Sequence, residues 1–225
     1  MEQSRAYEIL TENMQKEGCP LCRAVNDSVR QTMKSILYEG MTDRQIRERI
    51  RSQRGFCRHH GNMFLQEGDA LAHAIVYGDA LRAALKDVVA DDFTAFEKPK
   101  VCYFCEHTQK AEDLYVNAMT LSCQNAEFLE AYRKSAPLCL HHLHSVHECI
   151  KKKKLGEDLY TAVGQITIDN YQVLLDELDE IQRKNDYRFS HEAWTEGEKT
   201  AWKRVVGIIH DAVSLPQKKK GLFGK

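Results

Sequence analysis

Eight residues of this chain have the types and the spacing of metal ligands. Cysteine thiolates and histidine imidazoles are the donors that zinc and other borderline-soft metals prefer. The first pattern pairs Cys19 and Cys22, as C-x2-C, with Cys57 and His60, as C-x2-H. Three thiolates and one imidazole are a complete tetrahedral donor set.

The second pattern repeats the first. It pairs Cys102 and Cys105 with Cys139 and His142, and equivalent ligands of the two patterns are 83, 83, 82 and 82 residues apart. Six of the eight cysteines belong to the two patterns, so chance clustering is a poor explanation. This regularity indicates an internal duplication of about 83 residues, and it predicts one Cys3His metal site in each half of the chain.

A second histidine stands directly before each predicted histidine ligand, at His59 and His141. Residues three apart share a helix face, which makes His60 and His142 the better partners of the preceding cysteines. We expect His59 and His141 to be exposed or to lie behind the ligands. The spacing leaves open that either one replaces its neighbour.

The donor set favours two zinc ions, because closed Cys3His sets are typical of structural zinc sites. An iron–sulfur cluster is the alternative, since thiolates hold clusters and a histidine can replace a cysteine at one iron. The ligand pairs lie 35 and 34 residues apart, unlike the usual ferredoxin spacings. A disulfide framework requires an oxidising compartment, to which nothing in the sequence points.

Helices are the elements predicted to position these ligands. Apolar residues recur every three or four positions along the long segments, and no stretch has the alternation of a β-strand. The predicted fold is therefore all-α: two duplicated helical modules and a C-terminal helix. Helices are expected over residues 4–16, 20–37, 42–51, 69–89, 110–122, 126–134, 139–151, 157–186 and 195–213, with another beginning near residue 57.

The predicted domains are a first metal-binding module at 1–92, a second at 93–190, a packed helix at 191–215 and a disordered basic tail at 216–225. Phe93 and Phe96, in the connection between the modules, are expected to be buried. The residues expected to face the core from the helix at 69–89 are Leu71, Ile75, Leu81, Leu85 and Val88. Those expected from the last helix are Trp202, Val205, Val206 and Ile209.

The composition of the 225-residue chain sets broad limits on its function. A net charge of −1 gives no overall attraction to nucleic acid or anionic membranes. No apolar run reaches the ~18 residues of a membrane-spanning helix, and the N-terminus does not resemble a secretion signal. We therefore expect a cytoplasmic protein that has no membrane association.

Motifs for nucleotide binding, for serine hydrolases and for zinc proteases do not occur in the sequence. We predict no catalytic activity and assign the function to a helical surface that binds an unidentified partner protein. The first alternative is a redox or oxygen-sensing iron–sulfur protein. A weaker one is a nucleic-acid-binding regulator that uses the basic runs at 151–154 and 218–220, against which the acidic segment at 176–180 argues.

The assembled motifs resemble those of an uncharacterised family of bacterial and archaeal proteins of similar length. That family carries a CPxC, a GFCxxH, a second CxxC and a later CxxH. Here the first two motifs are Cys19-Pro-Leu-Cys22 and Gly55-Phe-Cys57-Arg-His-His60, and the resemblance covers about residues 5–185. The second CxxC, at Cys102, lacks the proline of the first. The resemblance implies the same eight ligands and no particular activity.

Overall fold

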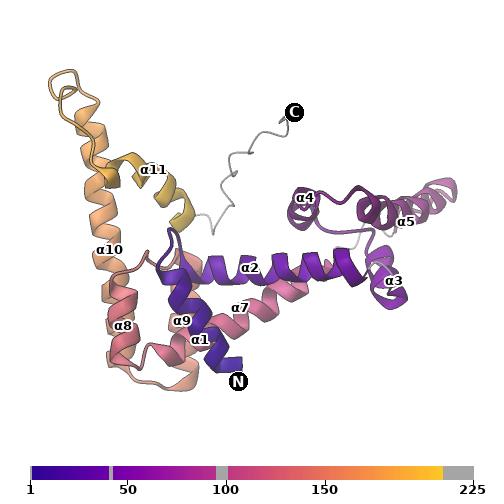
Figure 1. Ribbon diagram of the computed structural model, residues 1–225, viewed down its shortest axis with the longest axis horizontal. Helices are drawn as coiled ribbons and strands as arrows, with labels where there is room; N and C mark the ends of the chain where they lie inside the picture. The colour runs from indigo at the N-terminus through magenta and orange to yellow at the C-terminus, as the bar shows by residue number, and fades with distance from the viewer. Residues whose placement is uncertain (1, 41–42, 95–100, 210–225) are drawn as a thin grey trace. The chain divides into compact units, whose positions relative to one another are not determined.

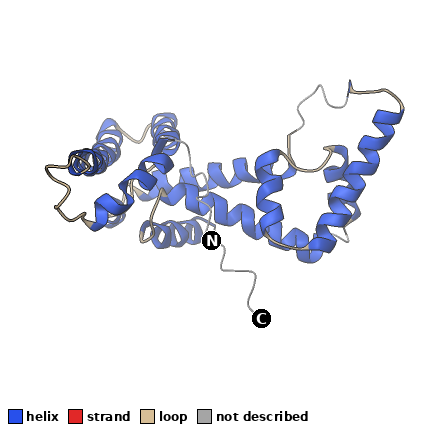
Figure 2. Cartoon of the chain, turned by 90° about the horizontal axis from the view of Figure 1, so that it is seen from above, coloured by secondary structure: helices blue, strands red, loops and turns tan. Residues whose placement is uncertain are grey.

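The computed structural model of the chain describes residues 2–40, 43–94 and 101–209. All regular elements within these ranges are helices (Figures 1 and 2), which confirms the all-α prediction. The predicted tail at 216–225, the basic run at 218–220 and Phe96 lie outside the described residues.

The same series of helices occurs in each half of the chain (Figure 1). A leading helix, α1 (Glu2–Met14), precedes the first series. The first series is α2 (Pro20–Ser35), continued by a π-helical turn (Ile36–Gly40), then α3 (Arg44–Ser52), α4 (Arg58–Gln66) and α5 (Ala70–Val89). The second is α7 (Tyr103–Ser122), α8 (Ala126–Arg133), α9 (Leu140–Lys153) and α10 (Glu157–Lys184), followed by α11 (Glu196–Ile209). The predicted duplication is thus a duplication of four helices.

Polar side chains fix where several of these helices begin. Asp43, Asp69 and Asn125 are the N-caps of α3, α5 and α8, and each side chain accepts hydrogen bonds from backbone N–H groups of the first turn. Such caps satisfy donors that have no partner within the helix. They explain why these three helix starts could be predicted to within a few residues, whereas α7 begins at Tyr103, seven residues before its predicted start.

The link from α3 to α4 depends on a glycine. Gly55 has a φ of +90°, and its N–H donates to the carbonyl of Ile50 at 3.0 Å, which ends α3. A Cβ at this position would lie 3.2 Å from the ring of Tyr77. Both the left-handed backbone and the close approach of the ring require glycine here.

The chain divides into two compact units that do not follow the sequence repeat. Unit 1 comprises residues 1–24 and 114–225, and unit 2 comprises residues 25–113. The division falls within α2 and within α7. It differs from the modules predicted at 1–92 and 93–190, because each unit takes segments from both repeats.

An aromatic cluster lies at the centre of unit 2. The ring of Phe56 lies 4.9 Å from that of Phe64 and 4.6 Å from that of Phe104, and Phe64 and Phe104 are fully buried. Burying one such ring stabilises the fold by about 1.5–3 kcal/mol. The other buried members of this core are Val29, Met33, Ile36, Ile50, Met63, Ala72, Val76 and Cys102.

In unit 1, α10 packs against both α9 and α11. Leu174, Ala201 and Ile208 form the buried contact between α10 and α11. The same two helices are joined by a buried ion pair in which Lys184 Nζ lies 2.8 Å from each carboxylate oxygen of Glu198.

The buried face of α5 differs from the prediction. Ala72, Val76 and Ala80 face the core, whereas four of the five expected core residues are exposed and the fifth, Ile75, is half-buried. The exposed fractions are 71% for Leu71, 70% for Leu81, 59% for Leu85 and 51% for Val88. Because α5 carries apolar residues on more than one of its sides, periodicity alone cannot show which side is buried.

Two further burial predictions are wrong. Phe93 is 49% exposed, because the segment after α5 leaves its ring beside solvent. In α11 the buried apolar residues are Ala201 and Ile208; of the predicted residues Val205 packs beside them, whereas Trp202 and Ile209 are more than half exposed and Val206 is 38% exposed. The α11 face that packs on α10 is thus the one that carries Ala201, Val205 and Ile208.

Candidate metal centres

Each C-x2-C pair lies at the start of a helix. Cys19 directly precedes α2 and Cys22 lies in its first turn, and Cys102 and Cys105 have the same positions at α7. The carbonyls of Cys19 and Cys102 accept the first hydrogen bonds of their helices, at 3.1 and 3.2 Å. This arrangement brings two sulfur atoms to the same helix N-terminus.

Each C-x2-H pair also lies at a helix start. Cys57 is the N-cap of α4, with φ −64° and ψ 164°, and Cys139 is the N-cap of α9, with φ −70° and ψ 165°. The two sulfur atoms accept hydrogen bonds from the backbone N–H of His60 and of His142, both at 3.5 Å. The two copies of the motif therefore share one backbone geometry.

The structure brings the eight residues together in two clusters, but it combines the pairs differently from the prediction. Site A consists of Cys19, Cys22, Cys139 and His142, and site B consists of Cys57, His60, Cys102 and Cys105. Each cluster takes its C-x2-C pair from one repeat and its C-x2-H pair from the other. This corrects the prediction that the ligands of one site belong to one module. Each site lies within one compact unit, site A in unit 1 and site B in unit 2.

The donor atoms of site A have the spacing of a small tetrahedron. The Nδ1 atom of His142 lies 3.2 Å from the sulfurs of Cys22 and Cys139 and 3.6 Å from that of Cys19. The sulfurs of Cys22 and Cys139 are 3.6 Å apart. Around one zinc ion, tetrahedral edges are about 3.8 Å between sulfurs and about 3.6 Å between sulfur and nitrogen.

Site B has nearly the same dimensions. The Nδ1 atom of His60 lies 3.3, 3.4 and 3.9 Å from the sulfurs of Cys57, Cys105 and Cys102. The sulfurs of Cys57 and Cys105 are 3.7 Å apart, whereas a disulfide would require about 2.05 Å. Both donor sets therefore fit a single ion of zinc size.

A threonine that the sequence analysis missed orients the histidine of site B. Thr108 donates its hydroxyl proton to the carbonyl of Phe104 at 2.8 Å, and its oxygen lies 3.1 Å from Nε2 of His60. Because that oxygen has only one proton to give, it accepts the Nε2–H of His60. Nδ1 is then left with the lone pair that a metal requires. The sequence feature that could have indicated this role is the position of Thr108, three residues after Cys105 on α7.

The neighbouring histidines are placed as expected. His59 and His141 are exposed, whereas His60 and His142 are buried. In each pair the two rings lie about 5 Å apart in an edge-on arrangement. Only the second histidine of each pair has its ring nitrogen among the sulfur atoms of a cluster.

The cysteine thiols of the metal-free clusters differ in pKa. Hydrogen bonds with Cys139 and Cys19, together with burial, raise the pKa of Cys22 far above its usual range. Burial also opposes ionisation of Cys19, but thiol hydrogen bonds from Cys139 and Cys22 lower its pKa well below the usual value. Burial and the neighbouring Cys57 raise the pKa of Cys105 to about 12. A metal ion must therefore displace protons from Cys22 and Cys105 as it binds.

Burial and the nearby His59 lower the pKa of His60 to about 4. This imidazole is therefore neutral at physiological pH, as a ligand must be. Two helix N-termini meet at each site, α2 and α9 at site A and α4 and α7 at site B. Their positive ends favour the thiolate forms.

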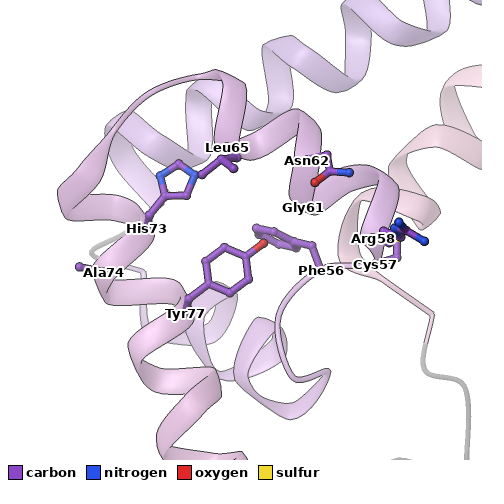
Figure 3. A pocket seen from close by; sticks show the side chains of 9 residues that line it. All are labelled: Phe56, Cys57, Arg58, Gly61, Asn62, Leu65, His73, Ala74 and Tyr77. Carbon is purple, nitrogen blue, oxygen red and sulfur yellow. The ribbon is translucent and has the colours of Figure 1, made fainter. Parts of the chain in front are cut away.

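The two sites differ in burial. All four residues of site A are buried, whereas Cys57 and Cys105 of site B are half-buried. A hollow of about 550 Å³ between α4 and α5 lies next to site B. As Figure 3 shows, the rings of Phe56, His73 and Tyr77 line this hollow, and Gly61 and Cys57 form part of its α4 side.

The remaining cysteines lie outside both clusters, as predicted. Cys123 is buried, and burial raises its pKa to about 12, so its thiol is inert at neutral pH. Cys149 is half-buried. His147, on the polar side of α9, stacks on Tyr160 with the ring centroids 3.9 Å apart.

In the part of the chain that the structure describes, we find no helix with both the length and the apolar character needed to cross a membrane.

Comparisons with known proteins identify relatives whose function is not known. Residues 6–99 and 94–214 match the family described as "Family of unknown function (DUF6062)". The boundary between the two matched segments coincides with the boundary between the repeats. The chain is 30% identical to an uncharacterised 23.9 kDa protein, named for the xynA 3′ region, of Caldicellulosiruptor sp. (strain Rt8B.4); the match covers 89% of this chain and 98% of that protein. No solved structure matches the chain significantly.

Proposed function

The chain belongs to the DUF6062 family, whose function is unknown, and we propose that it is a cytoplasmic helical protein in which two structural zinc ions support a surface that binds a partner protein. The observation that carries the metal assignment is the convergence of three sulfurs and one Nδ1 atom at each site. These atoms come from helix starts that are far apart in the sequence, so packing of apolar side chains does not account for their convergence.

The spacing of the donor atoms favours one zinc ion per site over a cluster. The donor atoms lie 3.2–3.9 Å apart in the pairs described above, close to the edges of one tetrahedron around a zinc ion. An iron–sulfur cluster distributes its ligands over separate iron atoms, and so would hold the outer donor atoms further apart.

A structural role follows from what the sites connect. Cys19 and His142 are 123 residues apart in the sequence, and Cys57 and Cys105 are 48 apart. A metal ion in each site would hold the start of one helix against the start of another. For small zinc-binding peptides, the binding free energy of about 10–16 kcal/mol is also folding free energy. The stability of both units would thus depend on their metals.

Helix α5 supports the proposed interaction with a partner. Its exposed side carries an apolar strip spaced three and four residues apart, formed by Leu71, Ala74, Gly78, Leu81, Leu85 and Val88. This spacing is that of one face of a coiled coil. Contiguous exposed apolar residues mark sites of interaction with other proteins, so we propose that an apolar helix of the partner covers this strip.

The basic run at 151–154 is explained by its position in α9. Lys151, Lys152 and Lys153 lie in the last helical turn and Lys154 is the C-cap, where cations are favoured by the helix dipole. Lys151 also forms an ion pair with Glu148 at 3.1 Å. These contacts give the run a role in ending the helix, which supports a protein partner over nucleic acid.

Elemental analysis and a visible spectrum test the metal assignment on full-length protein purified anaerobically without a metal-binding tag. We expect close to two zinc ions per chain and no visible colour. Iron with an equal amount of sulfide, together with a broad absorbance near 400 nm, would show that the sites hold an iron–sulfur cluster and not zinc. Intact thiols with no metal would refute the proposal.

A Leu81→Lys and Leu85→Lys double variant tests the proposed partner surface on α5. It should keep both zinc ions and lose binding to the partner protein.

A further inference from the structure

We propose that site B is a modification site for small hydroperoxides, at which Cys57 and Cys105 are oxidised to a disulfide and the metal leaves, while site A resists the same oxidant. This inference rests on the proposed function, since it requires zinc at both sites.

Access to sulfur distinguishes the two sites. At site A the exposed fractions of Cys19, Cys22 and Cys139 are 7%, 6% and 0%. At site B, Cys57 and Cys105 are only half-buried, and Cys57 also lines the hollow between α4 and α5. A peroxide must reach the sulfur atom that it oxidises, and susceptible cysteines are accessible thiolates.

One difference between the repeats explains the hollow. Gly61 of α4 lines it, and the equivalent residue of α9, 82 positions later, is Leu143. The backbone N–H groups of Gly61 and Leu143 donate to the carbonyls of Cys57 and Cys139 at 2.7 and 2.8 Å, which shows that the two positions correspond. Site A therefore carries a leucine side chain at the backbone position where site B has none.

Cys57 and Cys139 have the same local backbone setting. Cys57 and Cys139 are both helix N-caps with nearly equal φ and ψ, and each accepts a backbone N–H at 3.5 Å. The helix N-terminus favours the thiolate equally at both positions. Any difference in their reactivity must therefore come from access to the sulfur.

The oxidation is a two-electron reaction. The Cys57 sulfur attacks one oxygen of the hydroperoxide, the O–O bond breaks, and the leaving oxygen takes a proton to become water or an alcohol. Cys57 is then a sulfenic acid. The Cys105 sulfur, 3.7 Å away, attacks it, an S–S bond forms, and the S–O bond breaks to release hydroxide, which takes a second proton from solvent as water. The two thiolates lose the two electrons that the peroxide gains. With two of its four donors gone, the metal is released.

The experiment treats the zinc-loaded full-length chain with hydrogen peroxide and follows released zinc with a chromophoric chelator. Zinc content before the oxidant is added tests the proposed function separately. We expect one zinc ion to leave about tenfold faster than the other. Differential alkylation and peptide mapping at the end of the fast phase should find a disulfide between Cys57 and Cys105 and unmodified Cys19, Cys22 and Cys139.

A variant that closes the hollow leaves all the ligands in place. Gly61→Leu introduces the residue found at the equivalent position of site A, and should slow the fast phase severalfold toward the slow one. Its Cβ would lie 2.9 Å from the hydroxyl oxygen of Tyr77, so a Gly61→Leu and Tyr77→Phe double variant repeats the test without that oxygen. Gly207→Leu, on α11 where a Cβ meets nothing within 4 Å, is the matched control and should oxidise like the wild type.

Two zinc ions that leave at equal rates, or a first disulfide that involves Cys19, Cys22 or Cys139, would overturn the inference and leave the proposed function standing. A fast phase that Gly61→Leu and the double variant do not slow would also overturn it, because access through the hollow is its basis. A chain that contains no zinc at the outset would overturn both proposals together.

Discussion

Among the single residues around the two clusters, Thr108 has the most specific role after the ligands themselves. Its hydroxyl receives the Nε2–H of His60 because its own proton goes to the carbonyl of Phe104. This fixes the tautomer in which Nδ1 faces the three sulfurs. Partners that orient a ligating histidine commonly change metal affinity by about 10–100-fold.

Thr108→Val should therefore weaken zinc binding at site B by about tenfold or more and leave site A unchanged. Competition with a chelator of known affinity measures the two sites as separate phases. Thr32→Val removes a similar hydroxyl, which bonds to the carbonyl of Ser28 on α2, and should change neither phase. Equal affinities of Thr108→Val and wild type would show that the hydroxyl does not orient His60.

The eight residues of the two clusters could be predicted from the sequence because cysteine and histidine are rare. The two residues of each pair are three positions apart, which is the spacing expected at a helix start. Thr108 could not be predicted, since a threonine on a helix most often bonds to its own backbone, as this one also does. We attribute the difference in exposure between Cys57 and Cys139 to Gly61 and Leu143, a contrast that becomes informative only when the shared backbone geometry is known.

At the scale of elements, the helix starts and the turns between helices are the most strongly determined features. Gly55 ends α3, and Cys57 begins α4 two residues later. The position of the Cys57 sulfur thus depends on a turn whose backbone only glycine adopts without strain.

Gly55→Ala should destabilise the protein by about 1–3 kcal/mol, because it adds backbone strain and a contact with the ring of Tyr77. Gly68→Ala provides the comparison: its φ is +77° but a Cβ there meets nothing within 4 Å. It should show the strain without the contact and be less destabilising. Denaturant unfolding of both variants measures the difference, and equal losses would mean that the contact with Tyr77 has no cost.

The buried ion pair between α10 and α11 predicts a dependence on pH. The hydrogen bond from Lys184 lowers the pKa of Glu198 below its ordinary value. A carboxyl whose pKa is lowered by folding contributes stability above its unfolded pKa, and this contribution is lost as the pH falls through the lowered value.

Lys184→Met should therefore lower the melting temperature clearly at pH 7, and by less as the pH falls through the lowered pKa of Glu198 and this carboxyl becomes protonated. Lys199→Met, which removes the exposed partner of Glu196, is the control and should have little effect at either pH. Thermal unfolding across this pH range measures both. A deficit of Lys184→Met that does not shrink on acidification would contradict a role for the charge of Glu198.

The helices themselves could be predicted because capping residues and apolar periodicity agree in most segments. The buried face of α5 could not, because Leu71, Leu81 and Leu85 form as regular a pattern as the smaller residues Ala72, Val76 and Ala80 on the other side. Hydrophobicity predicts the larger side chains to be buried. The core of unit 2 accepts the smaller ones, since it is already filled by the rings of Phe56, Phe64 and Phe104.

For the whole molecule, the main feature is that each compact unit combines parts of both repeats. α2 and α7 each begin in one unit and end in the other, and their N-terminal cysteines lie in the unit that holds the C-x2-H pair of the other repeat. The sequence could not show this exchange. Cys22 and Cys57 are 35 positions apart, and a connection of this length would also allow them to meet in one site.

The central claim is that two zinc sites form by exchange of ligand pairs between the repeats, and double variants of the full chain test it most directly by their zinc content. Cys22→Ser with His142→Ala removes two ligands of site A only, so this protein should keep one zinc ion. Cys22→Ser with His60→Ala removes one ligand from each site, so it should keep about none. If the first variant instead loses both ions and the second keeps one, the ligands of each site come from a single repeat and the account is wrong.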